Sequence, residues 1–124
     1  MIIHPASEGD SPRKVVQVPT GPPPGCMRQL AQLSGVLEGS ETGPDSYCLW
    51  IRSAKGRRVP VLWPAGYHAR IDPLELLNVS GQVVARAGDL LVLGGGFRPI
   101  DPADPCSFGQ AQAFHVQHEM PERP

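Results

Sequence analysis

Short apolar runs separated by turn residues occupy most of this chain, and this pattern constrains its fold more than any other feature. Five such runs begin at Leu33, Tyr47, Arg58, Gln82 and Gln112. Runs of this length, bounded by Gly, Pro, Asp and Ser, are typical of a small β-barrel or sandwich. The second run is apolar on both of its alternating faces, which predicts a strand that is covered on both sides.

The length and the distribution of proline predict one domain with loose ends. A chain of 124 residues fits a single hydrophobic core. We predict a barrel domain over residues 28–119, a flexible Pro/Gly-rich lead-in over residues 1–27 and a disordered tail over residues 120–124. In the lead-in, the apolar patch from Val15 to Val18 is interpreted as a tether, with an added edge strand as the alternative.

One short helix is expected between the third and fourth runs. Asp72 is a suitable N-cap, Pro73 suits the first helical position, and Glu75 stands where its side chain can reach back to the cap. The predicted fold class is therefore mainly β, a five- to six-stranded barrel with one short helix between strands three and four.

Charge and hydropathy weigh against two classes of partner. The 11 Lys and Arg residues against 12 Asp and Glu residues leave no cationic excess of the kind that drives binding to nucleic-acid phosphates. No apolar run approaches the roughly 20 residues that span a bilayer, and the N-terminus has no signal-peptide pattern. The default expectation is a cytoplasmic protein, or an exported one if a signal segment is missing from this chain.

The sequence predicts no cofactor and no metal site. The cysteines show no C-x-x-C spacing, and His115 and His118 point to opposite faces of a strand because their separation is odd. The rival interpretation is a metal-binding or hydrolytic site made of His68, Asp72 and His115, which requires these groups to converge in the fold.

Three cysteines leave two redox interpretations open. The favoured interpretation is that all three are reduced thiols, namely Cys26, Cys48 and Cys106. The alternative is a disulfide between Cys48 and Cys106, which requires that the fold bring them together in an oxidising compartment.

The order of runs resembles the oligonucleotide/oligosaccharide-binding (OB) barrel, which places its helix between the third and fourth strands. More narrowly, Cys48-Leu49-Trp50, the phrase Trp63-Pro64-Ala65-Gly66-Tyr67 and the run from Asp72 to Leu77 are similar to a group of small actinobacterial proteins with no established activity. Some members of that group look exported, which keeps the Cys48–Cys106 pairing open.

The OB resemblance implies a ligand surface on the second and third strands, where aromatic side chains stack and arginines hold phosphate. Its candidate residues are Arg57, Arg58, Tyr67 and Arg70, with Trp63 added if it is exposed. The competing interpretation, favoured for Trp50 and Trp63, is that both tryptophans belong to the core.

The predicted function is accordingly a non-catalytic binding or interaction module for a protein, a carbohydrate or single-stranded nucleic acid. A structural accessory domain of a larger assembly, attached through the Pro-rich lead-in, is a further possibility.

Overall fold

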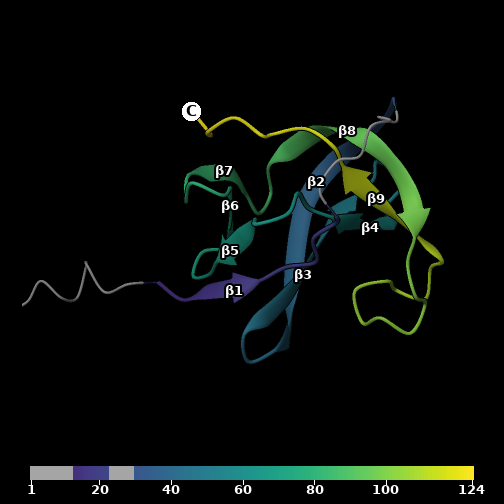
Figure 1. Ribbon diagram of the computed structural model, residues 1–124, viewed down its shortest axis with the longest axis horizontal. Helices are drawn as coiled ribbons and strands as arrows, with labels where there is room; N and C mark the ends of the chain where they lie inside the picture. Colours follow the sequence, from purple (N-terminus) through teal and green to yellow (C-terminus); the bar gives the residue numbers. More distant parts are fainter. Residues whose placement is uncertain (1–12, 23–29) are drawn as a thin grey trace, which may run out of the picture.

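The computed structural model describes residues 13–22 and 30–124, and the chain folds there into β-strands without any helix (Figure 1). The strands are β1 (Val15–Gln17), β2 (Ala31–Gly43), β3 (Ser46–Arg52), β4 (Arg58–Leu62), β5 (His68–Arg70), β6 (Glu75–Leu77), β7 (Val83–Arg86), β8 (Leu90–Pro99) and β9 (Gln112–Val116). Within these residues, nothing forms a helix long and apolar enough to cross a membrane.

Five of the strands close into a barrel. The ring runs β2, β8, β9, β4 and β3, and the pairing of β3 with β2 completes it. All neighbours in the ring are antiparallel except β4 and β9, which run parallel. The predicted β-barrel is confirmed. Four of the five apolar runs lie in the ring strands β2, β3, β4 and β9, and the run that begins at Gln82 forms β7 and the start of β8.

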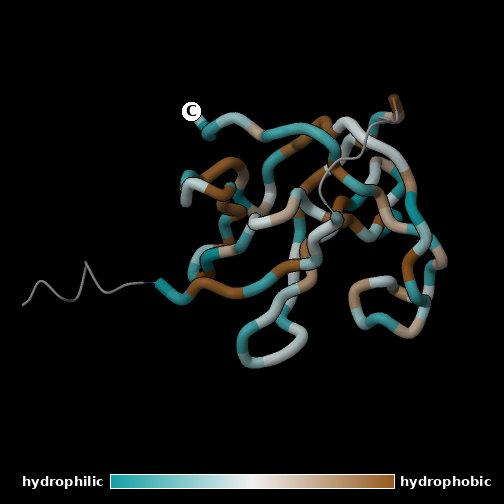
Figure 2. The backbone as a smooth tube through the Cα atoms, viewed as in Figure 1, coloured by the Kyte–Doolittle hydropathy of each residue, from teal (hydrophilic) through white to brown (hydrophobic). Residues whose placement is uncertain are grey.

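Each ring strand contributes at least one side chain to the core. Leu37, Ile51, Val61, Leu93 and Phe114 come from β2, β3, β4, β8 and β9, and all are fully or almost fully buried. In β3 the residues from Cys48 to Ile51 are buried on both faces, as its pattern predicted. Figure 2 shows hydrophobic stretches along the strands and more hydrophilic residues in the turn between β2 and β3.

The predicted helix after Asp72 is wrong. Asp72 has a φ of 65°, outside the extended region of an N-cap, and Glu75–Leu77 form β6 between β5 and β7. The reason is tertiary, because hydrogen bonding to two neighbouring strands and burial of Leu76 outweigh the local capping signal. Glu75 is buried among arginine side chains and does not cap a helix.

β5, β6 and β7 form an extension that continues the sheet beyond the ring. β1 joins it to the barrel, because Val15–Gln17 pairs antiparallel with β5 while Gln17 meets Ser46 of β3. Part of the predicted lead-in is thus folded, with Val16 only 1% exposed. The rest of that lead-in, residues 1–12 and 23–27, lies outside the described residues.

Two further segments, a glycine triplet and the C-terminal tail, are held by backbone contacts. The glycine triplet from Gly94 to Gly96 is part of β8, and a Cβ at Gly95 would stand 1.9 Å from the carbonyl oxygen of His115, so that only glycine permits this pairing. In the C-terminal tail, Met120 is 6% exposed and the Arg123 amide donates to the Val83 carbonyl at 2.7 Å.

Candidate functional site

The two aromatic residues of the predicted ligand surface lie in the core. Trp63 is 0% exposed, and its Nε1 donates to the Leu49 carbonyl at 3.3 Å. Tyr67 is 2% exposed, and its hydroxyl accepts a hydrogen bond from the Met120 amide at 3.0 Å. A ligand has no access to either ring, so these two side chains have a packing role in this structure.

The three arginines of that predicted surface belong to two different places. Arg57 and Arg58 lie at the hairpin between β3 and β4. Arg70 lies on β5 and donates from Nε and Nη2 to Glu75 Oε1, at 3.1 and 2.8 Å. The structure therefore keeps Arg57 and Arg58 together. Arg70 is separate from them, because it lies on a different strand and is bound to Glu75.

A compact aromatic and cationic cluster covers the outer face of the barrel at β3 and β4. The rings of Trp50 and Phe108 meet edge to face with centroids 5.0 Å apart. The Arg58 guanidinium lies over both rings, 4.3 Å from the Phe108 centroid and 5.6 Å from that of Trp50. Trp50 Nε1 also donates to Glu38 at 3.2 Å. Trp50 is left 7% exposed, so its ring is covered by the protein's own side chains.

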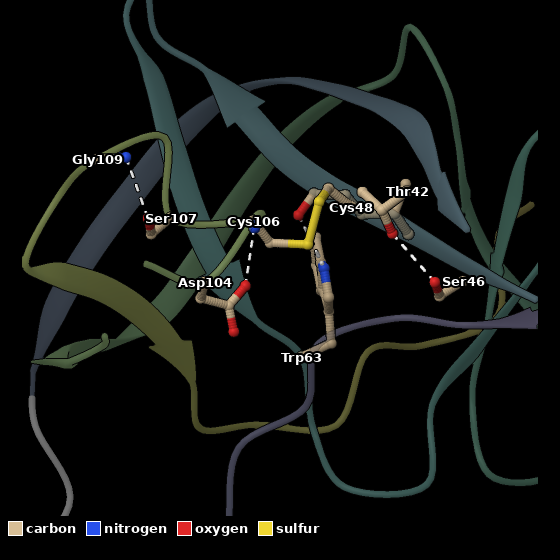
Figure 3. The surroundings of a disulfide bond; sticks show 9 residues. Thr42, Ser46, Cys48, Trp63, Asp104, Cys106, Ser107 and Gly109 are labelled. Carbon is tan, nitrogen blue, oxygen red and sulfur yellow. Dashed lines mark hydrogen bonds between the residues drawn. A yellow bond between two sulfur atoms is a disulfide. The ribbon is translucent and has the colours of Figure 1, made fainter. Parts of the chain in front are cut away.

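Phe108 belongs to the β8–β9 loop (residues 100–111), and a disulfide fastens that loop to β3. Cys48 and Cys106 are joined, with their Cα atoms 5.3 Å apart (Figure 3). Around the bond, Asp104 accepts the Cys106 amide at 2.8 Å, and Ser107 Oγ accepts the Gly109 amide at 3.0 Å. Sequence analysis did not single out Phe108, because nothing local to it indicates contact with Trp50.

A hollow of about 550 Å³ opens beside this cluster at one end of the barrel. This barrel-end hollow is lined by Arg57, Val59, Phe97, Gln110, Ala111 and Gln112. Phe97 is 45% exposed and sets its ring edge to face against the buried Phe114, at 5.4 Å between centroids. An exposed aromatic ring beside an apolar strand residue, rimmed by amide and guanidinium groups, is the usual composition of a ligand pocket.

The basic residues that form no ion pair with a described carboxylate belong to the β3–β4 hairpin and the end of β8. Six basic residues form ion pairs, namely Arg13, Lys14, Arg52, Arg70, Arg86 and Arg123. In the part of the chain that the structure describes, the others are Lys55, Arg57, Arg58 and Arg98, from the β3–β4 hairpin and the end of β8. The loop opposite carries Asp101 and Asp104, whose carboxylates accept backbone amides of that same loop.

His68 and His115, two members of the rival metal or hydrolytic site, lie in different surroundings. His68 is exposed, with its Nδ1 3.0 Å from the Gly66 carbonyl, whereas His115 is 2% exposed. Burial lowers the pKa of His115, the charge of Arg98 lowers it further, and a hydrogen bond to the Pro22 backbone acts in the opposite direction. Among residues 13–22 and 30–124, no group of three or more His, Cys, Asp or Glu side chains is placed to hold a metal ion. Cys26 lies outside these ranges.

Comparison with known proteins finds no family model, no curated protein and no solved structure that matches this chain. The resemblance to small actinobacterial proteins therefore gains no support, and the function has to be argued from the geometry.

Proposed function

We propose that this chain is a non-catalytic binding module built on an OB-like barrel, and that its ligand occupies the barrel-end hollow. The connectivity supports the fold assignment. β2, β3, β4, β8 and β9 follow the five-stranded Greek-key order of that barrel, and the extension of β5–β7 stands where its helix is usual. In such barrels the ligand lies on the second and third strands and on the loops beside them, which here are β3, β4 and the β8–β9 loop.

The observation that carries the proposal is the exposed ring of Phe97 facing a hollow whose rim holds Arg57. The Arg57 guanidinium has no hydrogen-bond or ion-pair partner among the described residues, so its charge is available to a ligand. Gln110 is held in place, since its side-chain amide donates to the Arg58 carbonyl at 2.8 Å. The hollow suits a ligand that combines an aromatic ring with an acidic group.

A nucleotide at the end of a single strand has this chemistry. Its base would stack on Phe97 and its phosphate would meet Arg57. The Trp50 ring is already covered by Phe108 and Arg58, so the site takes one base rather than an extended strand. A site for one terminal nucleotide also agrees with the chain's lack of a net cationic excess.

The experiment is an amide NMR titration with a short oligothymidylate and with the aromatic anion anilinonaphthalene sulfonate. We expect both to shift Gln110, Ala111 and Gln112. Phe97→Ala should weaken binding about tenfold, since stacking one base on an aromatic side chain contributes roughly 1–3 kcal/mol. Leu90→Ala is the matched control, because Leu90 lies on the same strand and is 75% exposed. Shifts that avoid the hollow, or equal losses in the two variants, would overturn the proposal.

A further inference from the structure

A second place with surplus positive charge lies outside the ring, where β5, β6 and β7 pair. Three arginines there converge on one carboxylate, that of Glu75, whose side chain is 3% exposed. Arg13 Nη1 and Arg70 Nη2 are 2.9 and 2.8 Å from Oε1, and Arg86 Nε is 2.8 Å from Oε2. The three guanidinium groups and the single carboxylate leave an excess of two positive charges.

The carboxylate is ionised. Burial by itself raises the pKa of Glu75, but hydrogen bonds from Arg70 and Arg86, together with the charge of Arg13, outweigh that effect and lower the pKa below its ordinary value. The other carboxylate nearby, Asp89, is bound to the Arg123 guanidinium by two hydrogen bonds of 2.8 and 3.0 Å, and it accepts the backbone amide of Arg86 at 2.9 Å. Among the described residues, no further carboxylate forms an ion pair with these three arginines.

The hydrogen-bond donors of the trio are only partly used. Arg13 is committed, because it also donates to the backbone carbonyls of Ile71 and Pro73. Arg86 gives Glu75 its Nε alone, its side chain is 51% exposed, and its terminal nitrogens have no hydrogen-bond partner among the described residues. Arg70 is 33% exposed, and its Nη1 has no hydrogen-bond partner in the part of the chain that the structure describes.

Sheet geometry fixes the two arginines on either side of the carboxylate. Glu75 is the cross-strand partner of Arg70 on β5 and of Arg86 on β7. β7 is the last strand of the sheet in the described residues, and the C-terminal tail meets its outer edge at Val83, whose carbonyl accepts the Arg123 amide. Two guanidinium groups held in this way, with spare N–H donors and surplus charge, form a site for an oxyanion that accepts hydrogen bonds at several oxygens.

We propose that Arg70 and Arg86, oriented by Glu75, bind a phosphate group, either as the free anion or as a phosphate monoester. This site is separate from the barrel-end hollow and does not depend on the function proposed for it. Arg13 is a positioning residue that ties the segment before β1 to the same carboxylate.

The test is calorimetric titration of the full chain with inorganic phosphate and with methyl phosphate, a monoester without the aromatic ring that the barrel-end hollow would bind, at constant ionic strength set by chloride. We expect saturable binding of at least one of the two. Arg86→Gln should weaken it about tenfold, the effect of losing one or two charge-assisted hydrogen bonds. Arg86→Lys should give an intermediate loss, because lysine keeps the charge and loses the planar fork.

Arg52→Gln is the matched control. Arg52 is 44% exposed and donates to Glu38 at 2.7 Å, so it resembles Arg86 in exposure and pairing but lies away from Glu75. Binding should be unchanged in this variant. If Arg86→Gln does not fold, the arginine side-chain NMR signals of the unaltered protein replace it, and those of Arg70 and Arg86 should shift with phosphate. Absence of saturable binding, an equal loss in Arg52→Gln, or no shift of these signals would overturn the inference.

Discussion

The β8–β9 loop and the β5–β7 extension are two additions to the same ring, and they are fastened by different chemistry. The loop has no strand pairing, and a disulfide, short-range turns and the contact of Phe108 with Trp50 hold it. The extension is held by sheet hydrogen bonds and by arginines around Glu75.

The difference follows from what each segment can bury. The strands of the extension pair their backbone N–H and C=O groups with one another and bury Leu76 and Ala85. Only the charge of the buried Glu75 carboxylate then has to be neutralised, and the arginines do this. The loop supplies few buried apolar side chains, and Ser107 is the one residue of residues 100–111 that is fully buried. A covalent link to β3 compensates for this small core contribution.

The largest effect should come from removing the disulfide. The bond links positions 58 residues apart, a loop for which chain entropy predicts a loss of about 4 kcal/mol in the free energy of unfolding. We expect the double variant Cys48→Ser with Cys106→Ser to lose most of that amount in urea denaturation. A reductant should destabilise the unaltered protein and leave the double variant unchanged. A double variant as stable as the parent would show that the turns and Phe108 hold the loop by themselves.

Removal of the buried carboxylate should have the next largest effect. Glu75→Gln leaves three arginines without their common negative charge and turns one acceptor oxygen into an amide donor. We expect a loss of about 2–3 kcal/mol, less than for a fully buried pair because the arginines keep contact with water. The dependence on pH should change as well. The folded pKa of Glu75 is lowered, so its contribution is complete above the unfolded value near pH 4.3 and is lost as pH falls through the folded value.

The measurement is urea unfolding of both proteins at a series of pH values between about 7 and 3. Below about pH 4.3 the unaltered protein should lose stability more steeply than Glu75→Gln. Asp89 and Glu38 should keep part of the slope in the variant, since arginine hydrogen bonds lower the pKa of each. Identical slopes would contradict a role for the ionised Glu75 carboxylate in stability.

The smallest expected effect should come from removing Phe108, the ring that packs against Trp50. Phe108→Ala removes an edge-to-face ring contact and one partner of Arg58, at a cost of about 1–2 kcal/mol. Tryptophan emission should shift to the red and become quenchable by iodide, because Trp63 stays buried and only Trp50 is uncovered. Phe97→Ala serves as the control and should leave the emission unchanged. Unchanged emission in Phe108→Ala would mean that another part of the loop covers Trp50.

The candidate sites show how far reasoning from the sequence reached. The sequence predicts one ligand surface made of Arg57, Arg58, Arg70 and Tyr67, whereas the structure buries Tyr67 and separates Arg70 from the other two arginines. The favoured interpretation of Trp50 and Trp63 as core residues agrees with their burial. Phe97 and Phe108 were not recognised, since their roles depend on contacts with residues in other strands. Glu75 was interpreted as a capping residue, because the arginines that surround it lie 5, 11 and 62 positions away in the chain.

The sequence by itself determined the β-rich character, the places of the ring strands and the apolar core, because alternation and turn residues act over a few positions. Only the tertiary structure decided the remaining features. These are the strand in place of the helix, the joining of Cys48 to Cys106 and the separation of Arg70 from the hairpin arginines. Each of them depends on pairing between distant segments, and the free energy of such pairing exceeds that of the local signals which pointed elsewhere.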